Sequence, residues 1–154
     1  MSDDLHLDFT FAAPIQSVYL ALTTRKGITC WWTTDAEVGV AAGDACTLRF
    51  PGVGIEFGML IVEHAPFDRV HWRCVASVHG GDSALGEDGW RGTELLFNLR
   101  PEDGMETRLS LTHLGMTPER ESYGMTQEGW LHYLGDSLRG YLEDGEGEPY
   151  GCGD

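Results

Sequence analysis

The chain has 154 residues, of which 42% are hydrophobic, and a formal charge of −15 from 25 acidic and 10 basic residues. This length supports one well-filled hydrophobic core and is too short for two ordinary domains. The acidic excess argues against nucleic-acid backbones and anionic membrane surfaces as partners.

The first part of the chain predicts one strand followed by two short helices. Residues 5–11 alternate apolar and polar side chains, which is typical of a half-buried strand. Pro14 suits the first turn of a helix over residues 14–23. A second short helical turn is predicted over 28–32, where two tryptophans are adjacent, and residues 33–44 form a connection that contains glycine and acids.

Five further strands are predicted, and turn residues separate most of them. They span residues 45–50, 55–64, 69–77, 92–100 and 106–114. Residues 79–90 contain four glycines and three acids and predict a mobile loop. Because strands joined by short links pair antiparallel, we expect a single antiparallel sheet.

The clearest helical periodicity lies between Ser122 and Glu143. One arc of this helix carries the apolar residues Tyr123, Trp130, Leu131, Leu134, Leu138, Tyr141 and Leu142. Each of its internal glycines lowers helix stability by about 1 kcal/mol relative to alanine, so this helix requires an apolar sheet to pack against. Thr117-Pro118-Glu119 predicts a helix start. Residues 1–143 then form one α+β domain, and residues 144–154 an acidic, Gly-rich, loosely ordered tail.

Three segments of the chain carry a resemblance to a known family. They are FTFAAPIQSVYLALTTRKGITCWWT, GTELLFNLRPEDGMETRLSLTHLGM and EGWLHYLGDSLRGYLEDGEGEPY. These segments resemble the START-like (SRPBCC) superfamily, and more closely its branch related to the activator of Hsp90 ATPase. The resemblance implies a helix-grip fold: a strongly twisted antiparallel sheet of about six strands wrapped around a long C-terminal helix, with two short helices after the first strand.

The resemblance also implies a cavity for an apolar ligand between the long helix and the sheet. The alternation of the strands and the helix arc predict which side chains face that space. The candidate lining residues are Trp32, Phe50, Phe57, Met59, Trp72, Thr93, Leu95, Phe97, Leu111, His113, Gln127, Trp130, Leu134 and Leu138. These side chains either fill the space as a closely packed core or line an open pocket, and both alternatives remain at this stage.

His113 is the main candidate for a polar role, because it is in phase with the inward-facing Leu109 and Leu111. It is either a hydrogen-bonded histidine at the margin of the core or a polar contact or acid–base group at the cavity mouth. Thr93 and Gln127 are its candidate neighbours. No nucleophile motif, P-loop or dinucleotide-binding glycine motif is present, so we assign no catalytic residue and no cofactor.

The other histidines and the cysteines do not suggest a metal site. His64, His71 and His79 lack ligand spacing, and Cys30, Cys46, Cys74 and Cys152 form no C-x-x-C pair. We expect reduced, mostly buried thiols. The N-terminus has no signal-peptide pattern and no run approaches the roughly 18 apolar residues of a membrane span, so we expect a soluble cytoplasmic protein.

Three functions remain in order of preference. The first is a binding module for a small apolar or amphipathic molecule. The second is a chaperone accessory or interaction protein of the Hsp90-activator type, which the resemblance alone implies. The third is a cavity enzyme, such as a cyclase or hydrolase with His113 as base. It ranks last because the sequence shows no paired acid–base signature. A protein partner and a homodimer stay open, and we expect neither nucleic acid nor membrane as a partner.

Overall fold

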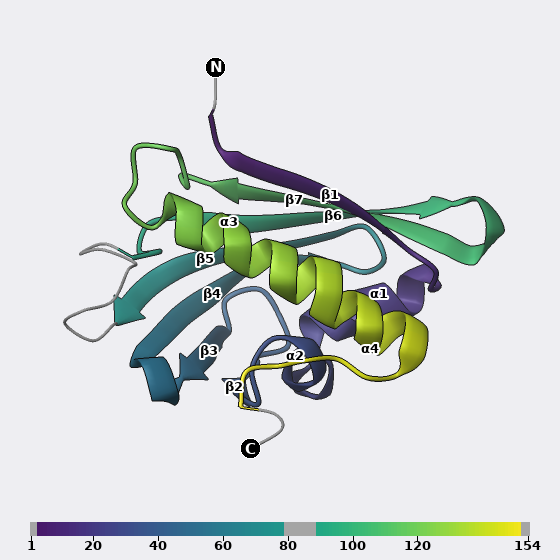
Figure 1. Cartoon of the computed structure of the whole chain (residues 1–154), viewed down its shortest axis with the longest axis horizontal. Helices are drawn as coiled ribbons and strands as arrows, with labels where there is room; N and C mark the ends of the chain where they lie inside the picture. Colours follow the sequence, from purple (N-terminus) through teal and green to yellow (C-terminus); the bar gives the residue numbers. More distant parts are fainter. Residues whose placement is uncertain (1–2, 79–88, 152–154) are drawn as a thin grey trace.

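A twisted antiparallel sheet curves around one long C-terminal helix in the computed structural model, which describes residues 3–78 and 89–151 (Figure 1). The strands are β1 (Leu5–Phe11), β2 (Asp35–Glu37), β3 (Ala45–Phe50), β4 (Ile55–Ala65), β5 (Arg69–Val78), β6 (Glu94–Glu102) and β7 (Glu106–Leu114). They form a seven-stranded sheet in the order β1-β7-β6-β5-β4-β3-β2. The predicted α+β helix-grip fold is confirmed, with one strand more than expected.

The additional strand is β2, which lies in the segment predicted to be a connection. It pairs with β3, placing Asp35 opposite Arg49 and Glu37 opposite Thr47. Its three residues carry only one buried side chain, Ala36. A strand this short and polar has no alternation to detect, so only its pairing partner reveals it.

The inward face of the sheet is the one that the alternation predicted. Its side chains are all buried: Leu48, Phe50, Phe57, Met59, Trp72, Cys74, Leu95, Phe97, Leu99, Leu109 and Leu111. The pairing registers β1–β7 and β6–β7 run without a shift, whereas β4–β5 shifts at Gly58/Met59 and at Ile61/Glu63. Such irregularities increase local twist, which helps this sheet to bend around the helix.

Two short helices follow β1, as predicted. They are α1 (Ile15–Thr23) and α2 (Arg25–Trp31), and Thr24 caps α2 by accepting a hydrogen bond from the backbone N–H of Gly27 at 3.0 Å. The Trp31 indole donates to the carbonyl of Ala21 at 2.7 Å, so the two helices are joined through the core.

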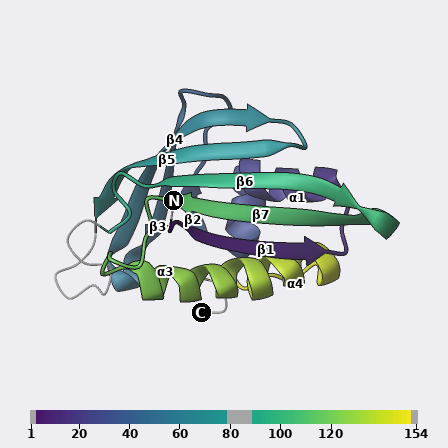
Figure 2. The ribbon, with the colours of Figure 1, turned by 90° about the horizontal axis from the view of Figure 1, so that it is seen from above.

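The long helix consists of α3 (Tyr123–Trp130), the π-helical segment η3 (Leu131–Leu138) and α4 (Arg139–Asp144). Figure 2 shows it running alongside the sheet next to β1. Trp130, Leu134 and Leu138 are buried, as predicted, but Leu131 is 47% exposed, so its place in the buried arc was wrong. Residues 130, 134 and 138 are four apart and share one face of the helix, whereas Leu131, one position after Trp130, points away from that face.

The predicted helix start at Thr117-Pro118-Glu119 is also wrong, because the helix begins at Tyr123. The intervening residues form turns that contact another part of the chain. Arg120 donates to the carbonyl of Gly89 at 3.0 Å, and the Ser122 hydroxyl donates to the same carbonyl at 3.2 Å. These long-range hydrogen bonds outweigh the local helix-start signal.

The segment after α4 packs on the domain instead of being loosely ordered as far as residue 151. Gly145 ends the helix with φ +81°, a left-handed conformation that glycine adopts without strain. The Glu148 backbone N–H donates to the Ser137 hydroxyl at 2.6 Å, and the Tyr150 N–H donates to the Trp32 carbonyl at 2.9 Å. A Cβ on Gly147 would lie 2.1 Å from the Cys30 carbonyl oxygen, so only glycine allows this close approach.

The mobile loop predicted over 79–90 lies outside the described residues apart from Gly89 and Trp90. Among the residues that the structure describes, no helix is long and apolar enough to cross a membrane.

Cys30, Cys46 and Cys74 are free thiols, and burial raises the pKa of Cys74 to about 12.

Candidate functional site

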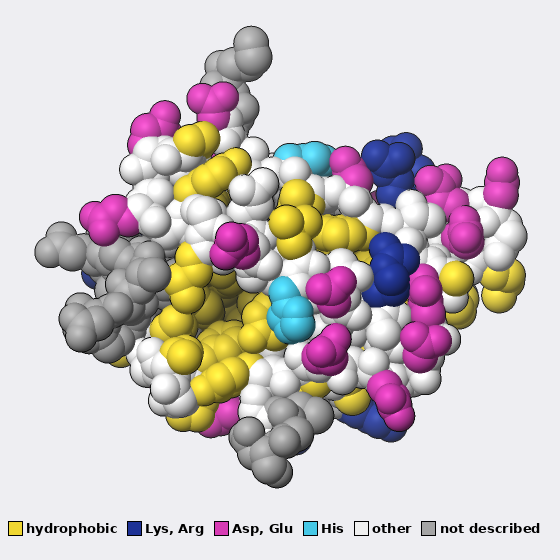
Figure 3. All heavy atoms as spheres, in the orientation of Figure 1, with side chains coloured by type: hydrophobic (Ala, Val, Ile, Leu, Met, Phe, Trp, Pro, Cys, Tyr) yellow, Lys and Arg dark blue, Asp and Glu magenta, His cyan; other side chains and the backbone are white. Residues whose placement is uncertain are grey.

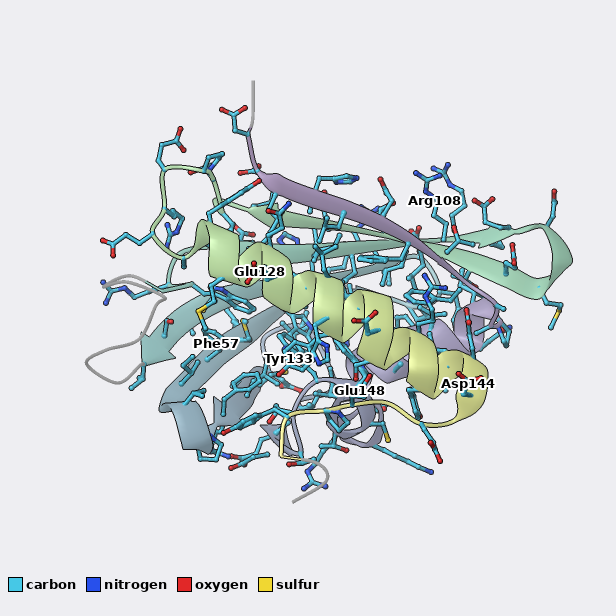
Figure 4. All side chains as sticks on the ribbon, viewed as in Figure 1. Phe57, Arg108, Glu128, Tyr133, Asp144 and Glu148 are labelled. Atoms are coloured by element: carbon cyan, nitrogen blue, oxygen red, sulfur yellow. The ribbon has the colours of Figure 1, made fainter. Side chains whose placement is uncertain are left out.

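An apolar pocket of about 240 Å³ opens beneath the N-terminal half of the long helix, where Figure 3 shows a hollow lined by hydrophobic side chains. Its walls come from the residue that follows α2, from β3, β4 and the turn between them, from α3 and η3, and from the chain near Trp90 and Tyr150. The lining residues are Trp32, Phe50, Val53, Ile55, Phe57, Trp90, Met125, Thr126, Gly129, Trp130, Tyr133 and Tyr150. In Figure 4, Phe57 from β4 and Tyr133 from η3 both lie below the helix.

A stack of aromatic rings forms the inner wall of the pocket. Phe57 stacks on Trp90 with centroids 4.0 Å apart, and Trp90 stacks on Trp130 at 5.4 Å. Trp32 contacts Trp130 at 5.1 Å and is backed by Trp31 at 5.3 Å. These rings occupy the space between the helix and the sheet at this end, so an aromatic wall bounds the pocket on its inner side.

The lining has little polarity. Its described side chains include no acid, base, histidine or cysteine. Thr126 is already engaged, because its hydroxyl oxygen accepts a hydrogen bond from the Trp90 indole at 2.9 Å. Burial, with a smaller effect of the nearby Tyr150, raises the pKa of the Tyr133 phenol, which therefore stays neutral near pH 7.

His113 lies behind the aromatic wall, with both ring nitrogens hydrogen-bonded. Its Nδ1 accepts from the Trp130 indole N–H at 3.1 Å, and its Nε2 lies 2.9 Å from the Thr93 hydroxyl oxygen. The Thr93 hydroxyl donates its only hydrogen to the carbonyl of Trp90 at 2.6 Å. Its oxygen must therefore act as the acceptor toward His113, so Nε2 is protonated and donates this hydrogen bond. Indole and hydroxyl partners together therefore select one neutral tautomer.

Burial holds His113 in this neutral form. The side chain is 0% exposed, and burial, with a smaller effect of the Arg120 charge, lowers its pKa to about 3. Of its two predicted environments, it occupies the hydrogen-bonded core position and not the mouth of a cavity. In this position His113 orients Trp130 and Trp90, which do line the pocket.

The structure brings only part of the predicted lining to this pocket. Trp32, Phe50, Phe57 and Trp130 contribute to it. The remaining candidates lie elsewhere in the core or behind the aromatic wall: Met59, Trp72, Thr93, Leu95, Phe97, Leu111, His113, Leu134 and Leu138. Gln127 is half-buried on α3 outside the lining, and Trp72 lies toward α1, where its indole donates to Nε2 of His64 at 2.9 Å.

Sequence reasoning missed two aromatic lining residues because they come from segments without periodicity. Trp90 follows the glycine-rich loop, and Tyr150 belongs to the predicted tail. The available signal was an isolated large aromatic within an otherwise polar, glycine-rich segment, which is an unusual place for one unless it is buried. Gly129 lines the pocket because its lack of a side chain leaves the space open.

No metal site emerges from the residues that the structure describes, since no group of three or more His, Cys, Asp or Glu side chains could hold an ion there. His71 and Glu94 are 2.6 Å apart on the sheet, but this is an isolated pair.

Comparisons with solved structures show the same fold. The solution structure of the Aha1 dimer from Colwellia psychrerythraea has a TM-score of 0.75 and 27% identity, covering 96% of this chain and 100% of that one. The crystal structure of MLL2253 from Mesorhizobium loti has a TM-score of 0.72 and 18% identity, covering 91% and 96%. That of SSP2350 from Staphylococcus saprophyticus has a TM-score of 0.70 and 16% identity, covering 94% and 95%.

A comparison with curated proteins gave no significant match. Residues 12–143, however, match the family described as activator of Hsp90 ATPase homolog 1-like protein. This segment includes all of the helix-grip elements except β1 and the last residue of α4. The chain therefore belongs to the family of activator of Hsp90 ATPase homolog 1-like proteins, a branch of the START-like superfamily.

Proposed function

We propose that this protein is a binding module for a small apolar molecule, which it holds in the pocket beneath the long helix. The observation that carries the proposal is the composition of the pocket: seven of its twelve lining residues are aromatic and none is charged among those described. Ligand pockets are concave, mostly apolar and supplied with few polar groups. The volume of about 240 Å³ suits a ligand of two or three fused rings better than a long lipid.

Exposed apolar side chains at the rim support the same proposal. Val53 is 57% exposed and Met125 is 42% exposed, and both line the pocket. An apolar ligand would remove water from these side chains as well as from the aromatic wall. At about 25 cal/mol per Å² of apolar surface, this burial favours binding.

The test of the proposed function uses two glycines of α3 as a matched pair. A Cβ at Gly129 or at Gly124 would meet no atom within 4 Å, but only Gly129 lines the pocket. Gly129→Leu should therefore place a side chain in the pocket and weaken binding of the neutral fluorophore prodan at least about 10-fold. Gly124→Leu, on the exposed part of the same helix, should leave the affinity unchanged.

Both substitutions replace a helical glycine and should stabilise the fold by up to about 1 kcal/mol, so loss of binding would not reflect unfolding. Fluorescence titration gives the affinities, and prodan should raise the melting temperature of the wild type and of Gly124→Leu. Absence of prodan binding to the wild type, or equal affinity in the two variants, would rule out this pocket as the site.

A second candidate function is that of a chaperone accessory protein. Its support is the family match over residues 12–143 together with the similarity to the Aha1 structure. Addition of this protein to a purified Hsp90 should then change the ATPase rate of the chaperone. An unchanged rate at saturating concentration, with a known activator as positive control, would count against this role.

A further inference from the structure

The indole N–H of Trp32, a pocket-lining residue, has no hydrogen-bond partner among the described residues, and the same holds for the hydroxyls of Tyr133 and Tyr150. Of these three groups, only the indole N–H is restricted to donating. The other four indoles of the chain each donate: Trp31 to Ala21, Trp72 to His64, Trp90 to Thr126 and Trp130 to His113, at 2.7, 2.9, 2.9 and 3.1 Å. Tryptophans that are buried usually satisfy this donor. Trp32 is therefore the exception within this core.

The position of Trp32 indicates where its N–H is accessible. The side chain is only 2% exposed and lines the pocket. In the described part of the chain, no fully buried side-chain nitrogen or oxygen lacks a partner. The unpaired Nε1 of Trp32 therefore retains contact with open space, and the open space that its ring borders is the pocket.

The chemistry of this group restricts the ligand. An indole N–H can only donate a hydrogen bond, so its ligand partner must be an acceptor. The pocket lining has no described basic side chain to balance a carboxylate or phosphate, and the formal charge of −15 disfavours anions further. A neutral acceptor, such as a carbonyl oxygen, fits both conditions.

The shape of the wall restricts the rest of the molecule. Trp32 contacts Trp90 and Trp130 as tilted ring pairs, Trp90 stacks on Trp130, and Phe57 extends this wall. Flat aromatic rings gain most from such a surface, because offset stacking adds to the burial of apolar area.

We propose that the pocket selects a neutral, planar aromatic carbonyl compound, whose carbonyl oxygen accepts a hydrogen bond from Nε1 of Trp32. This inference rests on the proposed function, since it names the ligand class of the same pocket. It assigns Trp32 as the specificity-determining residue. The aromatic wall supplies affinity for the rings, and Trp32 distinguishes a ketone from the corresponding hydrocarbon.

The experiment compares fluorenone with fluorene, two tricyclic compounds that differ by the carbonyl group. Fluorene would cover the Trp32 N–H without offering an acceptor, which leaves a buried donor unpaired. The wild type should therefore bind fluorenone about 10-fold more tightly than fluorene. Trp32→Phe should bring this ratio close to unity, whereas Trp31→Phe, the same change at the adjacent residue outside the lining, should retain it.

The indole N–H resonance of Trp32 in the wild type gives a readout that does not depend on the folding of any variant. It should shift downfield on addition of fluorenone and not on addition of fluorene. Equal affinities for the two compounds, a ratio retained in Trp32→Phe, or an unshifted resonance in the fluorenone complex would each overturn the inference and leave the pocket itself intact. Failure of both compounds to bind would overturn the proposed function together with the inference.

Discussion

At the scale of single residues, His113 shows how one buried polar side chain organises several aromatic ones. It accepts a hydrogen bond from Trp130, contacts Trp90 edge-on at 4.8 Å, and reaches the Trp90 carbonyl through Thr93. A neutral imidazole satisfies all of these contacts. A protonated imidazole could not accept from Trp130 and would be a buried charge beside Arg120.

The stability of the protein should therefore fall in mildly acidic solution. The folded-state pKa of His113 is about 3 and its ordinary value is 6.5, so between these values the unfolded chain binds a proton that the folded chain excludes. Above pH 6.5 His113 is neutral in both the folded and the unfolded state, so its titration does not change the free energy of unfolding. Below it, each pH unit should lower that free energy by up to about 1.4 kcal/mol.

Urea unfolding at about pH 7.5 and about pH 5 should then differ by up to about 2 kcal/mol from this residue alone. His113→Gln serves as the control: it should be less stable at both pH values but have a smaller difference between them. His64, whose pKa burial also lowers, remains in both proteins and cancels in the comparison. The same pH difference in wild type and variant would show that His113 is not the titrating group.

At the scale of elements, the long helix is held at both of its sides. Toward β1, Arg139 donates to the carbonyl of Thr10 at 2.9 Å, and Glu143 accepts from the Ala12 N–H at 2.9 Å. These bonds satisfy backbone groups of an edge strand. On the opposite side, the buried hydroxyl of Ser137 donates to the carbonyl of Trp31 at 2.7 Å.

Ser137 joins three segments, because it also accepts from the Glu148 N–H. Ser137→Ala should lower the free energy of unfolding by about 1–3 kcal/mol, since it leaves buried backbone groups without partners. Hydrogen exchange at the Glu148 amide should become faster. Ser17→Ala, at an exposed position of α1, should change stability by less than about 0.5 kcal/mol. An unchanged exchange rate at Glu148 would mean that Ser137 does not anchor the C-terminal segment.

At the scale of the whole molecule, negative charge dominates the surface, and acidic side chains are spread over the face seen in Figure 3. Several of the few basic groups are paired. Arg49 lies 3.2 Å from Asp35 and 3.3 Å from Glu56, and Arg69 lies 3.0 Å from Glu63. Exposed pairs of this kind add little stability, but they reduce the positive potential available to a polyanion.

Duplex DNA should therefore not bind near physiological salt. Fluorescence anisotropy of a labelled duplex should stay constant as protein is added, with a basic DNA-binding protein as positive control. A binding curve that weakens steeply as salt is added would contradict the prediction, because that dependence is the signature of phosphate contacts.

The sequence by itself determined the elements with a regular pattern. Alternation predicted β1, β3 and β7 with their observed bounds, and it predicted which face of the sheet is buried. Periodicity predicted the long helix, with Trp130, Leu134 and Leu138 on its buried side. These features depend on the geometry of the chain over a few residues. Side chains alternate across a strand and repeat about every 3.6 residues along a helix, so the order of apolar and polar residues predicts the element and its buried face.

Only the tertiary structure decided what covers the sheet and where space remains. Trp90 reaches the aromatic wall, Tyr150 borders the pocket, and Leu131 turns outward, although local patterns predict none of these positions. The four lining residues that were predicted come from β3, β4, the residue after α2 and the long helix. Of the eight that were missed, four come from the long helix, one from β4, and three from turns and the C-terminal segment. A residue pattern shows which side of an element avoids water. Which distant segment packs there, and how much volume the packing leaves open, depends on contacts between residues far apart in the chain.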